Sequence, residues 1–198
     1  MEGYTLEYLI TDVNKIAKRP DPQELYLVVR ESVKSVFMDI GIELLCDYQS
    51  NKIETIKDGR VRLGKDILLV DKVTDDRGLT GLETNGATVG SAFAKANVFS
   101  FKQTPFELIF GEDKKGRVKL AYYAFYLDEN GACIIPSAAY KACKSMAIYE
   151  CLDIANRDHP YWADRLIYRS DAQTETFKAR GHLNKTTSAR RSTTQRFY

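Results

Sequence analysis

The sequence contains few of the residues that usually mark catalytic or metal sites. It has only two histidines, His159 and His182, and neither lies in an HExxH or similar frame. No GxSxG, GxxxxGK[ST] or GxGxxG motif is present to place a nucleophile or cradle a phosphate. These absences favour a protein that is not an enzyme, and they predict neither a metal ion nor a cofactor.

Cysteine is sparse as well. The chain has four, none in CxxC spacing: Cys46, Cys133, Cys143 and Cys151. A disulfide framework is unusual in a chain of 198 residues with so few cysteines. A zinc site is not expected either, because both histidines lie far from any cysteine pair. We expect the thiols to act as small buried apolar side chains.

Long apolar runs are absent. No stretch approaches the roughly 18 apolar residues of a membrane span. The first residues, MEGYTLEYLITD, are acidic and lack the pattern of a signal peptide. We therefore expect no membrane partner and assembly in a cytoplasm. The net charge of +2 indicates no particular partner.

Two helices are predicted at the start of the chain. Residues 5–18 carry apolar side chains at helical spacing, with Thr5 as a possible N-cap. Asp21 can cap the second helix, which carries one apolar stripe and ends near Gly41. The chain therefore opens with a helical hairpin.

The periodicity then changes to that of strands. Asp58 and Gly59 lie between two strand-like runs, which predicts a hairpin turn. Residues 67–70 and 118–127 read as buried strands, the second of them central because it is apolar on both faces. Residues 75–92 contain four glycines and little periodicity, which predicts a long loop or arm.

A helix starting near Pro136 is apolar over most of its circumference. Five of its residues share one face: Tyr140, Cys143, Ala147, Cys151 and Ile154. Two explanations remain open at this point, burial within the chain and burial against neighbouring subunits, and a helix can do both. A last helix is expected over 161–180, with Gly181 as its stop.

The C-terminal segment is basic. After Glu175 no acidic residue follows. Lys178 is the first of its cations. The candidates for docking are the cations and aromatics that follow: Arg180, Lys185, Arg190, Arg191, Arg196, Phe197 and Tyr198. Such a tail can dock on a partner protein, which we favour, or contact a phosphate backbone without sequence specificity.

The fold class predicted is α+β, a helical bundle core with an inserted small antiparallel β-domain and an extended C-terminal arm. The expected parts are a helical hairpin over 1–42, a β-rich insertion over 43–135, C-terminal helices over 136–180 and a basic extended tail over 181–198.

Two segments resemble a known family. KDGRVRLGKDILLVDKVTDDRG (57–78) has a short DG hairpin that leads into an apolar strand. GRVKLAYYAFYLDENGACIIPSAAYKACKSMAIYECL (116–152) has a Tyr-rich strand, a DE-G–IP turn and then a helix. Together they resemble the head-to-tail connector or adaptor proteins of tailed bacteriophages, of the short-tailed or crAss-like type.

The resemblance implies a structural virion protein of the phage neck. Such proteins typically form twelve-subunit rings beneath the portal, continue the DNA channel and give other neck and tail proteins a platform. It implies that the apolar face of the helix after Pro136, from Tyr140 to Ile154, packs against neighbouring subunits of the ring. It also implies that the basic tail docks on the portal and that DNA is contacted non-specifically at most. It also implies an inter-subunit loop, represented by Asp76, Arg77, Leu79 and Leu82. The alternative is a small nucleic-acid-binding module that acts through its tail.

Overall fold

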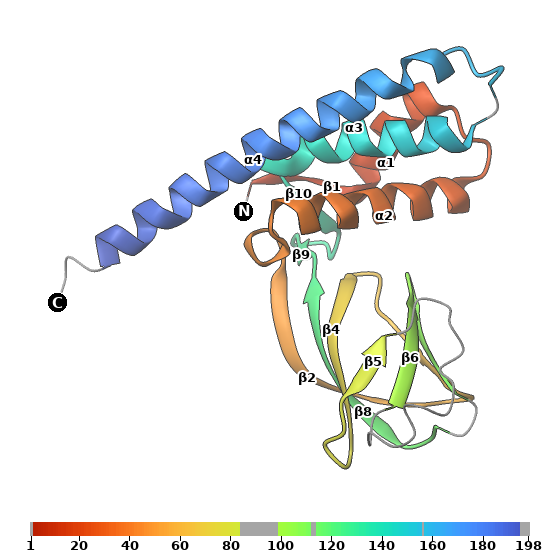
Figure 1. Cartoon of the computed structure of the whole chain (residues 1–198), viewed down its shortest axis with the longest axis vertical. Coiled ribbons are helices and arrows are strands. Elements are labelled where there is room, and N and C mark those ends of the chain that lie inside the picture. Colours follow the sequence, from red (N-terminus) through yellow and green to blue (C-terminus); the bar gives the residue numbers. More distant parts are fainter. Residues whose placement is uncertain (1, 84–98, 112–113, 156, 195–198) are drawn as a thin grey trace. The chain divides into compact units, whose positions relative to one another are not determined.

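The computed structural model describes residues 2–83, 99–111, 114–155 and 157–194 (Figure 1). The chain divides into two compact units. Met1–Leu45 and Tyr126–Tyr198 form the helical unit, and Cys46–Phe125 forms the β unit. The α+β class, the N-terminal helical pair and the inserted β-domain are therefore confirmed. Residues 126–135, which we placed in the insertion, belong to the helical unit.

The helical unit packs three helices around a fourth. Its elements are β1 Gly3–Thr5, α1 Leu6–Ala17, α2 Pro22–Ile40, η1 Ile42–Leu44, β9 Tyr126–Leu127, β10 Cys133–Pro136, α3 Ser137–Ile154, η3 Trp162–Asp164 and α4 Arg165–Thr194. Helices α1, α2 and α4 all pack against α3. This position explains why α3 is apolar on nearly every side. A small antiparallel sheet in the order β1-β10-β9 completes the unit.

The predicted helix starts are confirmed in atomic detail. The Thr5 hydroxyl accepts a hydrogen bond of 3.1 Å from the backbone N–H of Tyr8. The Asp21 carboxylate accepts one of 2.8 Å from the N–H of Gln23. Each cap satisfies a backbone donor that the first turn of a helix leaves without a partner, and this fixes where α1 and α2 begin.

The β unit is built from two sheets. The first has the order β2-β8-β4 and the second β3-β7-β6-β5. Their strands are β2 Asp47–Thr55, β3 Arg60–Arg62, β4 Ile67–Asp75, β5 Gly81–Glu83, β6 Phe99–Thr104, β7 Glu107–Phe110 and β8 Arg117–Ala124. All pairs are antiparallel except β5 with β6. As predicted, β8 is central in its sheet.

One apolar core occupies the β unit. Alternate residues of β8 are buried, and residues of the second sheet join them in the same cluster. The members are Ile56, Val61, Leu63, Ile67, Val70, Val73, Phe101, Leu108, Phe110, Val118, Leu120, Tyr122 and Ala124. Burial of this set is the main contribution to the stability of the unit.

The turn at Asp58 and Gly59 exists, but the predicted hairpin does not extend from it. Both residues have positive φ, 51° and 71°, and Lys57 and Arg60 exchange two backbone hydrogen bonds of 2.9 Å. The flanking strands then separate, because β2 pairs with β8 whereas β3 pairs with β7. The turn therefore passes the chain from one sheet to the other.

Candidate interaction surfaces

Helix α4 lies antiparallel to α3. Near its start, Arg165 Nε lies 3.3 Å from Asp153 Oδ1, and the Arg169 guanidinium lies 5.5 Å from the centre of the Tyr149 ring. Further along, Ala172 and Ala179 are buried. Small side chains at these positions let the two helices approach closely, so α4 is anchored over its first half.

The sequence predicts that Gly181 ends the last helix, but this prediction is wrong. Helix α4 continues through Gly181 to Thr194. A glycine ends a helix when it adopts the left-handed conformation, and Gly181 has no positive φ. Glycine inside a helix costs only about 1 kcal/mol relative to alanine, so the residues around it can carry the helix onward. The part of the tail up to Thr194 is therefore helical and not extended. In Figure 1, α4 runs alongside α3 and continues past it.

The seven docking candidates of the tail divide into three groups. Arg180 and Lys185 are exposed on α4. Arg190 and Arg191 lie on the last turns of the helix, where only the backbone is described. The remaining three candidates, Arg196, Phe197 and Tyr198, lie outside the described residues.

Apolar side chains of α4 also reach solvent. Phe177 is 80% exposed, and Leu166 and Ile167 are 56% and 59% exposed. Phe177 lies about 160° around the helix from the buried Ala179, so it points away from the bundle. Sequence reasoning did not single out this residue, because an aromatic side chain in an amphipathic pattern reads as part of a core.

The face of α3 expected to pack between subunits is buried inside the helical unit itself. Cys143, Ala147 and Cys151 are fully buried, and Tyr140 is 9% exposed. Ile154, the fifth member, is 55% exposed. Four of the five residues are thus covered by α1, α2 and α4, which is a correction to the ring-packing assignment. Only Ile154 remains open to a neighbour.

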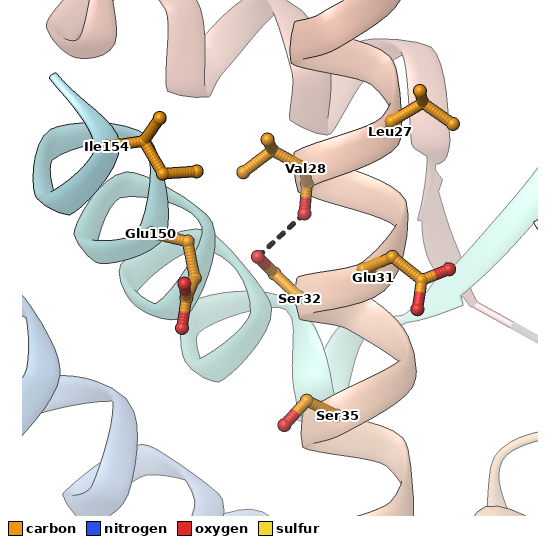
Figure 2. Close-up of a pocket in the computed structure, with 7 residues that line it drawn as sticks. All are labelled: Leu27, Val28, Glu31, Ser32, Ser35, Glu150 and Ile154. Carbon is orange, nitrogen blue, oxygen red and sulfur yellow. Dashed lines mark hydrogen bonds between the residues drawn. The ribbon is translucent and has the colours of Figure 1, made fainter. Parts of the chain in front are cut away.

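Ile154 borders a groove between α2 and α3 (Figure 2). The groove has a volume of about 400 Å³. Its lining comes from α2 (Leu27, Val28, Glu31, Ser32 and Ser35) and from α3 (Glu150 and Ile154). The Ser32 hydroxyl donates its hydrogen bond to the Val28 carbonyl over 2.8 Å, so that donor is not available to a ligand in the groove. The groove therefore presents apolar side chains with acidic groups beside them.

Glu150, which lines this groove, has a carboxyl group whose pKa is raised. Burial raises its pKa, and the charge of nearby Asp153 raises it further, while Arg169 lowers it. A half-buried carboxylate of this kind is stabilised by any cation that approaches from solvent.

A tyrosine cluster on α1, β1 and α3 was not expected from the sequence. The ring centres of Tyr4 and Tyr140 are 4.2 Å apart, and those of Tyr4 and Tyr8 are 5.5 Å apart. The Tyr140 hydroxyl donates to Asp12 Oδ2 over 2.9 Å, and Lys144 Nζ lies 2.6 Å from the same oxygen. Tyr140 is 128 residues from Asp12 in the sequence, so no local pattern could have revealed that α3 joins the cluster.

The expected inter-subunit loop is a tight turn in its first part. Asp75 is buried, and its Oδ1 accepts hydrogen bonds from the backbone N–H groups of Arg77 and Leu79 over 3.0 and 2.9 Å. Asp76 and Arg77 are exposed and Leu79 is half-buried. Leu82 lies in β5, where its backbone alone is described, and the rest of the loop, 84–92, lies outside the described residues.

No model of a known protein family matches the chain, and a search of curated proteins finds no significant relative. Within the described ranges, no three His, Cys, Asp or Glu side chains gather as metal ligands would. Across the same part of the chain, no helix has both the length and the hydropathy needed to cross a bilayer.

Proposed function

We propose that this chain is a structural protein of the neck of a tailed bacteriophage. Copies of it form a ring, dodecameric in the family that it resembles, between the portal and the tail. The ring continues the DNA channel and gives other neck and tail proteins a platform. The protein is thus a component of the virion that assembles in the host cytoplasm.

The observation that carries this proposal is the exposed apolar surface of α4. Phe177 is 80% exposed on a helix of 30 residues, with Arg180 exposed one turn further on. Aromatic side chains beside arginine are typical of the residues that dominate protein–protein interfaces. A surface of this kind is better explained by a protein that assembles with other subunits than by one that acts as a monomer.

The arrangement of the chain gives further support. The resemblance rests on 57–78 and 116–152, and it implies a helical core interrupted by a β-domain. The helical unit is interrupted in this way by Cys46–Phe125. The portal would then be met by the end of α4 and the residues that follow it.

Native mass spectrometry of the protein, alone and mixed with the portal protein of the same phage, tests the proposal. We expect a ring, or saturable binding near one copy per portal subunit. A variant that lacks 184–198 should keep its fold, because Ala179 is the last buried residue among the α4 side chains that the structure describes, but should bind the portal less. A wild-type monomer that ignores the portal would overturn the proposal.

The alternative function, non-specific nucleic-acid binding, is favoured by the absence of acidic residues after Glu175. Phosphate contacts make such binding fall steeply with salt. Titration of double-stranded DNA at 50 and 200 mM salt, with Arg180→Gln and Lys185→Gln as a double variant, distinguishes the two. Salt-dependent binding that the double variant weakens, in a chain that ignores the portal, would favour the alternative.

A further inference from the structure

We infer that the face of α4 around Phe177 docks in the α2/α3 groove of a second copy of this chain. The inference rests on the proposed ring and names the contact that builds it. The contact surface is the "α4 knob", formed by Phe177, Arg180 and Gly181, and its receptor is the groove in Figure 2.

The α4 knob has the composition of an interface. Arg180 and Gly181 follow Phe177 by three and four residues, so all three lie on one face of the helix. An added Cβ at Gly181 would meet nothing within 4 Å in its own chain. Packing inside the monomer therefore gives no reason for a residue that destabilises a helix by about 1 kcal/mol. A glycine does, however, allow another backbone to come close to the helix.

The groove is complementary to the knob in polarity and charge. Leu27 and Ile154, 36% and 55% exposed, supply apolar surface for an aromatic ring. Glu31 is 45% exposed, and its contacts with Lys34 and Arg30 are long, at 3.9 and 3.5 Å. A carboxylate held this loosely can accept the fork of an incoming arginine, which pairs with carboxylates through two parallel bonds.

A chain cannot fill its own groove with its own knob. The contacts of Arg165 with Asp153 and of Arg169 with Tyr149 set the register of the two helices and place Phe177 level with Lys141. The groove lies near the other end of α3, at Glu150 and Ile154. At 1.5 Å per residue the two levels differ by about 15 Å along the bundle.

Two different surfaces of one molecule therefore meet in each contact. Where each copy gives its knob to one neighbour and its groove to another, the contact is heterologous, and repeated copies of it close into a ring when the rotation between subunits permits. Two copies that exchange knob and groove reciprocally would instead form an isologous dimer and stop there. The proposed ring requires the first arrangement, and covalent oligomers longer than a dimer distinguish it from the second.

Cysteine cross-linking tests this contact. The natural thiols are buried, and burial raises the pKa of Cys46 to about 12 and of Cys151 to about 11, so engineered surface thiols react first. Under mild oxidation, the pair Phe177→Cys and Leu27→Cys should give a ladder of covalent oligomers. The matched pair Phe177→Cys and Tyr8→Cys, with Tyr8 51% exposed on α1, should give at least fivefold less.

A second variant separates contact from folding. Phe177→Asp should keep the melting temperature within about 2 °C, because the side chain is exposed, while it weakens ring formation at least tenfold in native mass spectrometry. A wild-type ring that survives Phe177→Asp, or equal cross-linking in both cysteine pairs, would overturn this inference and leave the proposed function standing. A wild-type chain that forms no ring with or without the portal would overturn both.

Discussion

Lys144 Nζ lies 2.6 Å from Asp12 Oδ2, and this ion pair joins α3 to α1. The hydrogen bond from Lys144 is the main reason why the pKa of Asp12 is lowered to about 2, with Tyr140 and Lys15 as further donors and burial opposing them. Because Asp12 also accepts from Tyr140, the pair fixes the tyrosine cluster against both helices.

The Asp12 network predicts acid sensitivity. A carboxyl whose pKa is lowered on folding stabilises the protein above its unfolded pKa, near 3.8, and that stability is lost as the pH falls toward 2. We expect Asp12→Asn to lose about 1 kcal/mol at pH 7, with the difference from wild type shrinking below pH 4. Urea unfolding at pH 7 and pH 3 measures it. The exposed Asp39→Asn is the control, and an equal loss there would remove the explanation.

Ala147 and Ile154 lie seven residues apart on the same face of α3, but the structure buries only Ala147. Ala147 is fully buried, whereas Ile154 is 55% exposed. We expect Ala147→Glu to destabilise the helical unit by more than about 3 kcal/mol, because it buries a charge without a partner. Ile154→Glu should change stability by less than about 0.5 kcal/mol. Thermal melts followed by circular dichroism at 222 nm compare them, and equal melting temperatures would contradict the packing of α3.

Gly181 and Gly131 are a matched pair for backbone effects. An added Cβ meets nothing within 4 Å at either position, but Gly131 has φ 78° and Gly181 is helical. Gly181→Ala should stabilise the protein by about 0.5–1 kcal/mol, and Gly131→Ala should destabilise it by about 1 kcal/mol. Chemical denaturation measures both. A destabilised Gly181→Ala would mean that the helix does not pass through this residue.

The ion pair of Lys114 and Asp75 stabilises the turn after β4. Lys114 Nζ lies 2.7 Å from Asp75 Oδ2, while Asp75 is buried and also accepts from two backbone N–H groups. Burial alone would raise the pKa of Asp75, but the bonds from Lys114 and from the backbone outweigh it and lower that pKa. We expect Lys114→Met to destabilise the β unit by about 2 kcal/mol. Calorimetry measures the loss, and the exposed Lys65→Met should show none. Equal melting temperatures for Lys114→Met and Lys65→Met would show that the ion pair of Lys114 and Asp75 does not stabilise the β unit.

Local signals in the sequence predicted several elements correctly. Thr5 and Asp21 marked the starts of α1 and α2, because an N-cap acts within three residues of itself. The continuous apolar character of 118–127 likewise placed β8 in the centre of its sheet. In both cases the signal lies in the residues of the element itself: an N-cap side chain beside the helix start, and apolar residues on both faces of the strand.

Pairing between distant residues was not predictable in the same way. The Asp58–Gly59 turn fixes only the four residues around it, and the partner of each flanking strand is chosen by packing of the two sheets. The same holds for the cluster of Tyr4, Tyr8 and Tyr140, which forms only when α1 meets α3. The continuation of α4 beyond Gly181 is a third case, since glycine permits a stop without requiring one.

The first and last strands of the β unit are neighbours, and this has a consequence for how the protein can vary. Asp47 in β2 is the register partner of Ala124 in β8, so the chain enters and leaves the unit at adjacent points. Partners across an antiparallel ladder lie about 5 Å apart, a gap that a short turn spans. The β unit is therefore a cassette that related chains could lengthen, exchange or lose while the path of the helices on either side stays the same.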